Sequence, residues 1–96
     1  MEIREFQQLI KKLYYEKDLR RGREKTLIWL VEEVGELAEA VRKNDFKSVR
    51  EEMADVFAWL VSLANLYDVD LEEAVKSKYP NVCKKCGKIP CECDER

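Results

Sequence analysis

Residues 24–43 read EKTLIWLVEEVGELAEAVRK, and residues 45–67 read DFKSVREEMADVFAWLVSLANLY. In each stretch apolar side chains recur every three or four positions, which is the period of an amphipathic α-helix. Asn44 separates the two stretches, and Asp45 is a suitable N-cap for the second helix. A link this short forces neighbouring helices to run antiparallel. The sequence therefore predicts a central helical hairpin.

Two further helices are predicted on either side of the hairpin. Residues 2 to about 20 carry apolar side chains at helical spacing, at Ile3, Phe6, Ile10, Leu13 and Tyr14. Asp70, with Glu73 three residues later, has the form of a capping box that opens a short fourth helix. Pro80 ends this helix, because proline cannot continue it.

The composition is that of a small, folded, helix-rich protein. Charged residues make up 40% and apolar residues 46% of the 96 positions, and no strand pattern competes with the helical one. We expect an all-α helix bundle in residues 1–80, with three long helices and one short helix, followed by a cysteine-rich zinc-binding tail in residues 81–96.

Charge and hydropathy limit the partners of the chain. A net charge of −2 does not favour nonspecific attraction to nucleic acid or to an anionic membrane. No apolar stretch approaches the roughly 20 residues of a membrane span, and the N-terminal MEIREFQQ does not have the layout of a signal peptide. We therefore expect a cytoplasmic protein.

Each helix of the hairpin carries two carboxylates three residues apart, Glu33 with Glu36 and Glu52 with Asp55. Most acidic pairs on helices simply face solvent. Here, however, Glu52 falls inside the apolar arc of its helix, Asp55 lies at the edge of that arc, and apolar ridges flank Glu33 and Glu36. Burying like charges is costly unless a cation compensates, and hard cations prefer carboxylate oxygens. The pattern predicts a site for magnesium, or for manganese, in the hairpin seam.

The segments around these acids, EEVGELAEAVRK and EEMADVFAWLVSLANLYDVDLEEAV, closely resemble the motif of MazG-type nucleotide pyrophosphohydrolases. The resemblance covers about residues 23 to 80. It implies an all-α fold in which Glu33, Glu36, Glu52 and Asp55 bind magnesium and form the catalytic centre. It also implies hydrolysis of a nucleoside triphosphate, possible substrates being a dNTP or a non-canonical NTP, to the monophosphate and pyrophosphate.

The resemblance is weaker where contacts to the phosphates are expected. Family members commonly continue the last helix with Lys, Asn and Arg residues, whereas this chain offers Lys76 and Lys78 and then turns to cysteines. We take these two lysines as candidate phosphate contacts, the alternative being ordinary solvated lysines. Arg23 is a further candidate. Trp59, close to the acids, is the candidate for stacking on the base, with core packing as the alternative.

Four cysteines lie within eleven residues near the C-terminus, at positions Cys83, Cys86, Cys91 and Cys93. The first pair, followed by Gly87, is typical of a zinc knuckle, in which glycine permits a tight turn. Metal binding is favoured over disulfides in a cytoplasmic protein, although reversible disulfides or unliganded thiols remain alternatives. Because four thiolates leave zinc no open position for water, we expect a structural zinc ion.

Other interpretations compete with the enzyme. A noncatalytic zinc-stabilised adaptor is one, but no aromatic residue is interleaved with the lysines of the tail. A phosphoribosyl-ATP pyrophosphohydrolase is another; that group shares the acidic layout but carries a histidine after the second acidic motif, and this chain has none. A di-iron bundle also needs histidine ligands. Because both faces of the helix in residues 24–43 are apolar, we further expect a homodimer or homotetramer.

Overall fold

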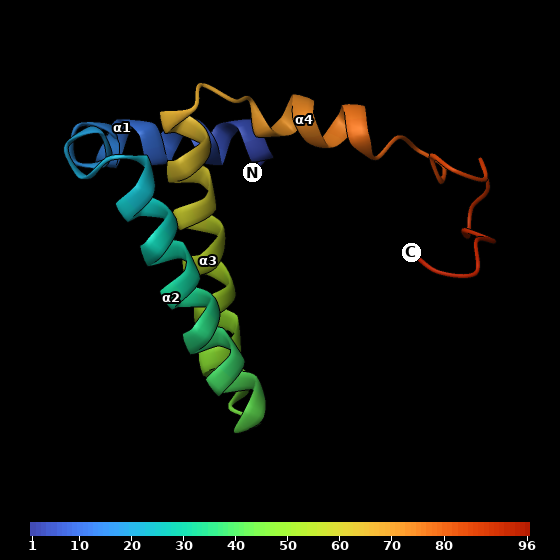
Figure 1. Cartoon of the computed structure of the whole chain (residues 1–96), viewed down its shortest axis with the longest axis horizontal. Helices are drawn as coiled ribbons and strands as arrows, with labels where there is room; N and C mark the ends of the chain where they lie inside the picture. The colour runs from blue at the N-terminus through green and yellow to red at the C-terminus, as the bar shows by residue number, and fades with distance from the viewer.

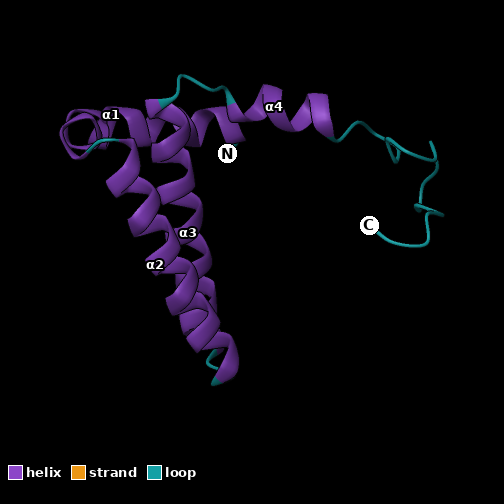
Figure 2. Ribbon diagram, in the orientation of Figure 1, coloured by secondary structure: helices purple, strands orange, loops and turns teal.

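The computed structural model describes residues 1–96 and consists of four helices, with no strand (Figures 1 and 2). The helices are α1 (Ile3–Arg21), α2 (Arg23–Arg42), α3 (Phe46–Leu66) and α4 (Leu71–Lys78). The predicted all-α fold of three long helices and one short helix is confirmed. Its predicted boundaries agree with the structure to about one residue.

Capping interactions explain where the helices begin. Asp45 and Asp70 each accept a hydrogen bond from the backbone N–H three residues later, with oxygen–nitrogen distances of 3.2 Å, as an N-cap does. At α4 only one of the two hydrogen bonds of the predicted capping box forms. The Glu73 side chain does not accept a hydrogen bond from the backbone N–H of Asp70. A complete capping box starts α1 instead, between Glu2 and Glu5, and the sequence analysis did not identify it.

The helices α2 and α3 form the predicted antiparallel hairpin and make the most extensive packing in the molecule. The helix α1 lies across the end of the hairpin where α3 finishes, and it packs mainly on α3 (Figure 1). The helix α4 contacts α1 and points away from the hairpin, carrying the C-terminal tail with it (Figure 1). The hairpin seam and the α1–α3 junction are therefore the two most extensive helix contacts in the molecule.

A buried network of polar groups fastens α1 to α3 and to the start of α4. The Gln7 amide donates hydrogen bonds to Asn65 Oδ1 at 3.0 Å and to the Val69 carbonyl at 2.7 Å. In return, Gln7 Oε1 accepts a bond from the backbone N–H of Leu71 at 3.0 Å. Because both amide side chains are buried, these bonds fix how α1 crosses α3.

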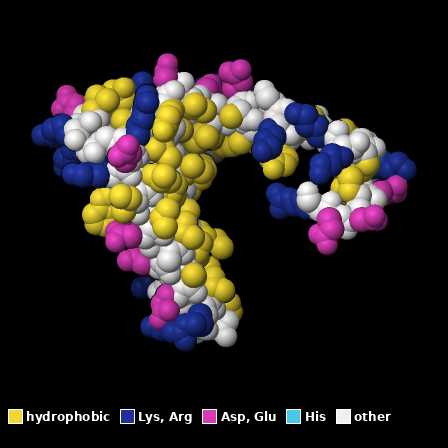
Figure 3. Space-filling model, in the orientation of Figure 1, with side chains coloured by type: hydrophobic (Ala, Val, Ile, Leu, Met, Phe, Trp, Pro, Cys, Tyr) yellow, Lys and Arg dark blue, Asp and Glu magenta, His cyan; other side chains and the backbone are white.

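The fold leaves much apolar surface uncovered. The only buried apolar residues are Ile10, Ala40, Val61 and Ala64. The radius of gyration is 15.8 Å, compared with about 12.5 Å for a compact chain of this length. The accessible surface is 7789 Å², compared with about 5,800 Å² for a compact protein of this mass. Figure 3 shows the uncovered hydrophobic side chains along the hairpin and in the bend towards α4. None of the helices, however, is both long and apolar enough to span a membrane.

Candidate metal and nucleotide site

Three of the four predicted ligand carboxylates come together in the seam of the hairpin. Glu33, Glu36 and Glu52 each bring one carboxylate oxygen within 4.8 Å of the others. The first two lie one turn apart on α2, and Glu52 faces them from α3 because the hairpin sets the two helices side by side. Glu33 and Glu52 are partly buried, whereas Glu36 is exposed, like Glu32 and Glu39 on the same helix.

The acidic cluster of Glu33, Glu36 and Glu52 has the properties of a cation site. One oxygen of Glu33 and one of Glu52, the Oε2 atom in each case, are buried without a hydrogen-bond partner. Burial, together with the neighbouring carboxyls of Glu52 and Glu36, raises the pKa of Glu33 from 4.5 to about 7. A buried carboxylate oxygen is costly to leave unpaired, and an all-oxygen donor set suits hard divalent cations. The donors and their burial therefore fit magnesium or manganese.

The fourth predicted ligand, Asp55, lies beside this cluster. It follows Glu52 by one turn of α3, but its exposed side chain lines a separate cleft between α1 and α3 with a volume of about 340 Å³. Trp59, the predicted base-stacking residue, lines the same cleft and stacks on Trp29 with ring centroids 5.9 Å apart. The structure thus brings Asp55 and Trp59 together, next to the three converging carboxylates.

The predicted phosphate-binding lysines lie elsewhere in the chain. Lys76 and Lys78 belong to α4, which points away from the hairpin (Figure 1). The Lys76 ammonium group lies 3.6 Å from a carboxylate oxygen of Glu72 on its own helix. The structure therefore does not bring these lysines to the acidic cluster within one chain.

Arg23, the weaker candidate, supports the end of α3. Its Nε and Nη2 groups donate hydrogen bonds of 3.2 and 3.1 Å to the carbonyl of Leu66, and its guanidinium lies 4.3 Å from the ring centroid of Tyr67. A cation at a helix C-terminus satisfies a carbonyl that has no partner within the helix and interacts favourably with the helix dipole. These contacts with the end of α3 explain the position of Arg23 without a phosphate ligand.

Two cations that the sequence analysis missed line the α1–α3 cleft. Lys17 makes no ion pair, and Arg21 donates from Nη1 to Asp18 Oδ1 at 2.9 Å. Neither residue lies near the acidic motifs in the sequence. Their position depends on how α1 crosses α3, for which α1 itself carries no recognisable signal.

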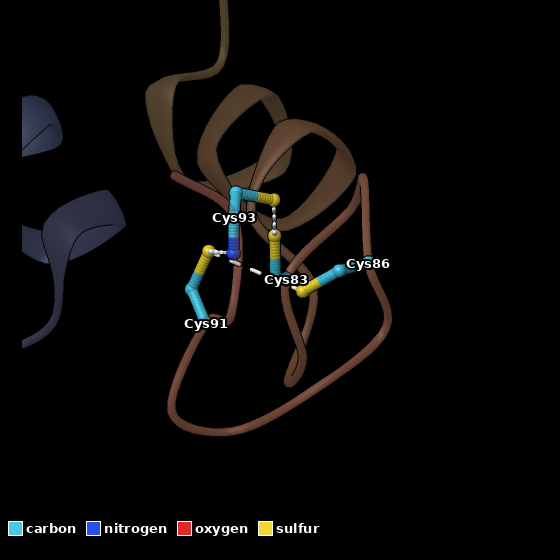
Figure 4. A group of neighbouring side chains, drawn as sticks. All are labelled: Cys83, Cys86, Cys91 and Cys93. Carbon is cyan, nitrogen blue, oxygen red and sulfur yellow. Dashed lines mark hydrogen bonds between the residues drawn. The ribbon is translucent and has the colours of Figure 1, made fainter. Parts of the chain in front are cut away.

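The four cysteine sulfurs of the tail converge (Figure 4). The Sγ–Sγ distance is 3.9 Å between Cys83 and Cys93 and 4.0 Å between Cys86 and Cys91, and all four atoms lie within 4.8 Å of one another. Four sulfurs at about 2.3 Å from a common zinc ion are about 3.8 Å apart in a tetrahedron. A disulfide needs a separation of about 2.05 Å. The spacing therefore fits a four-thiolate metal site, and the four thiols are free.

The tail backbone shapes this cysteine cluster. Gly87, with φ of +73°, closes the turn and donates its N–H to the Cys83 carbonyl at 2.7 Å. Backbone N–H groups in the turn lower the pKa of the Cys83 thiol to about 6, whereas the neighbouring thiols, Cys91 first, raise the pKa of Cys93 to about 12. One thiolate thus forms readily, and its negative charge disfavours ionisation of a second thiol. A bound cation would offset this repulsion between thiolates.

Comparison with known families gives a match that covers most of the chain. The sequence profile described as the MazG nucleotide pyrophosphohydrolase domain matches residues 21–87. This range includes α2, α3 and α4, both acidic motifs and the first two cysteines. Comparison with curated proteins gives no match. The resemblance identified from the acidic motifs is confirmed.

Proposed function

The chain belongs to the MazG nucleotide pyrophosphohydrolase domain family, and on this premise we propose that it hydrolyses a nucleoside triphosphate to the monophosphate and pyrophosphate with the help of magnesium. The observation that carries the proposal is the convergence of Glu33, Glu36 and Glu52, two of whose buried oxygens have no partner. These residues lie inside the family-matched segment. A structural role alone does not explain three carboxylates facing one another without a cation.

The carboxylates have distinct tasks in this proposal. Glu33, Glu36 and Glu52 would hold magnesium, or manganese in its place, and Asp55 would present a further carboxylate on the substrate side of the cluster. A bound divalent ion supplies positive charge that offsets the triphosphate and polarises its phosphoryl oxygens. The proposed reaction needs no side-chain nucleophile: water would attack the α-phosphorus directly, with pyrophosphate as the leaving group.

We further propose that the active protein is a homodimer or homotetramer. The many exposed apolar side chains support this, and the total accessible surface exceeds that of a compact monomer by about 2,000 Å², an area of the size buried in stable interfaces. Because Lys76 and Lys78 lie away from the acidic cluster of their own chain, they could contact phosphates only at the site of a second copy. Light scattering should give about twice or four times 11.4 kDa, and a monomer would contradict the proposal.

We propose that the cysteine cluster binds a structural zinc ion that orders the tail. The sulfur spacing and the closed set of four thiolates support this role, because no position is left for a reacting water. Metal analysis of reduced protein should find about one zinc per chain. Its absence from carefully prepared protein would remove this part of the proposal.

The catalytic assignment is tested by single substitutions with a matched control. Glu36→Gln and Asp55→Asn should each lower magnesium-dependent pyrophosphate release by about a hundredfold or more, the size of effect seen when one strong electrostatic contact is lost. Glu51→Gln removes the same charge from an exposed position next to Glu52 and should change the rate little. Activity that survives both of the first substitutions would overturn the assignment.

A further inference from the structure

Asp18 is a buried acid that does not belong to the acidic cluster. Its exposed fraction is 1%, and it belongs to α1, outside the hairpin. One carboxylate oxygen, Oδ1, accepts a hydrogen bond from Arg21 Nη1 at 2.9 Å. The other, Oδ2, is buried without a partner. An unpaired carboxylate oxygen in the interior is unfavourable, and the sites where one persists are commonly functional.

The same carboxylate lines the cleft between α1 and α3. Side chains of both helices form its walls, among them Tyr14, Lys17, Asp18 and Arg21 from α1 and Asp55 and Trp59 from α3. A volume of about 340 Å³ lies at the lower end of the range for small-molecule pockets. The cleft therefore combines aromatic walls, cations and one unsatisfied hydrogen-bond acceptor.

Surrounding contacts hold this acceptor in place. The Arg21 guanidinium lies 4.7 Å from the ring centroid of Trp59 and also donates to Thr26 Oγ1 at 3.2 Å. Thr26 is fully buried, and its hydroxyl donates in turn to the Gly22 carbonyl at 2.7 Å. Arg21 is thus fixed by three partners, and through it the orientation of the Asp18 carboxylate is fixed as well.

The helix α3 connects the cleft with the acidic cluster. Glu52, Asp55 and Trp59 are spaced by three and four residues, so they follow one face of the helix. Seven residues of helix correspond to about 10 Å. A nucleotide with its phosphates near Glu52 and Asp55 would extend its nucleoside along this face and bring the base to the level of Trp59.

Resting on the proposed function, we propose that the α1–α3 cleft binds the nucleobase, and that the lining side chains shift on binding so that Asp18 Oδ2 accepts a hydrogen bond from a ring N–H or an exocyclic amino group of that base. Arg21, beside it, offers donors to a neighbouring carbonyl or ring nitrogen. Tyr14, Lys17 and Asp18 precede the family-matched residues 21–87. Asp18 is then a determinant of base specificity.

Other occupants of the cleft fit less well. A phosphate group would be repelled by the free oxygen of Asp18. A metal ion would need further ligands, but Asp18 and Asp55 belong to neither of the two groups of potential metal ligands in the protein. A base edge supplies the N–H donor that Asp18 lacks and also apolar surface for Tyr14 and Trp59.

The test compares a nucleotide with a ligand that has no base. Asp18→Asn keeps the shape of the side chain and exchanges an acceptor for a donor. It should raise the KM for the best nucleoside triphosphate about 10- to 100-fold, as the loss of a hydrogen bond to a charged group does. The inhibition constant of inorganic tripolyphosphate, which occupies only the phosphate site, should stay within about twofold. Glu16→Gln, an exposed acid on the same helix, is the matched control and should change neither constant.

A second measurement needs no variant. The unaltered protein should have a KM at least about tenfold higher for an analogue of its best nucleotide that lacks the donor on the base edge. Asp18→Asn should lose this discrimination. Equal changes for nucleotide and tripolyphosphate, or unaltered discrimination, would overturn the inference while leaving the proposed function intact. Absence of turnover for every nucleotide by the unaltered protein would overturn both.

Discussion

Replacing Glu33 by glutamine should stabilise the magnesium-free protein at pH 8 and at the same time remove its magnesium-dependent activity. In the folded protein the carboxylate of Glu33 is partly buried among Glu36 and Glu52 and has an oxygen without a partner. A neutral amide of the same shape keeps the packing, removes the repulsion and can donate a hydrogen bond to Glu52. Stability and function should therefore change in opposite directions.

The magnitude follows from the pKa of Glu33. Raising it from 4.5 to about 7 corresponds to about 3.5 kcal/mol at most, since a tenfold change in an ionisation constant is about 1.4 kcal/mol. Solvent access to the cluster reduces this, and we expect about 1–2 kcal/mol. Between pH 4.5 and 7 the folded state binds more protons than the unfolded state. The free energy of unfolding therefore falls by this amount as the pH rises from 4.5 through 7. Glu33→Gln should abolish that loss.

The assay is urea unfolding at fixed protein concentration in magnesium-free buffer, at pH 5 and at pH 8, without a chelator that would also remove zinc. Glu33→Gln should raise the free energy of unfolding at pH 8, and the gain should be much smaller at pH 5. Glu32→Gln changes the same charge on the exposed side of α2 and is the control. The reasoning is refuted if Glu33→Gln is no more stable than Glu32→Gln at pH 8, or if its advantage is independent of pH.

Three further predictions concern the pH dependence, the α1–α3 junction and the tail. The magnesium concentration for half-maximal activity should fall between pH 6 and pH 8, because the proton on Glu33 must leave before a cation binds; a constant value in a titration would speak against the cluster as the metal site. Gln7→Ala should lower the free energy of unfolding in urea by about 2–4 kcal/mol, because it leaves buried polar groups unpaired, whereas the exposed Gln8→Ala should cost less than about 0.5 kcal/mol; similar values for both would show that the network is not stabilising. Cys83→Ser should release zinc and open the tail lysines to trypsin, and a digestion pattern like that of the unaltered protein would contradict a zinc-ordered tail.

The helices could be predicted because their determinants are local. A 3.6-residue apolar period and an aspartate just before the first turn are properties of a single segment, and Asp45 and Asp70 both act as N-caps in the structure. The helical period also placed Glu33 and Glu52 towards the apolar side, and both are partly buried. With a link as short as Asn44, only an antiparallel hairpin remained, so the meeting of the acids across it could be expected.

The α1–α3 cleft could not be predicted in the same way. Its residues come from two helices far apart in the sequence, and their meeting depends on the crossing of α1 over α3, which Gln7 and Asn65 fix. Neither amide stands out in a hydropathy pattern. The burial of Asp18 likewise depends on Arg21 and on the end of α3 and not on any motif in α1.

The lysines of α4 illustrate a further limit. Lys76 and Lys78 were selected by analogy with the last helix of the family, but the direction of α4 depends on its contacts with α1 and not on its own sequence. Arg4, for example, binds Asp70 and Glu72 at the start of α4 at 3.0 and 3.1 Å. The direction of α4 thus places the two lysines away from the acidic cluster, although their own helix was predicted correctly.

The acidic cluster is tested most directly by measuring pyrophosphate release from a panel of canonical and modified nucleoside triphosphates, with and without magnesium, by zinc-replete protein. The protein should show turnover that requires magnesium, differs between bases and is lost in Glu36→Gln. No release from any member of the panel, or equal release by the Glu36→Gln protein, would contradict the assignment of the acidic cluster as a catalytic magnesium site.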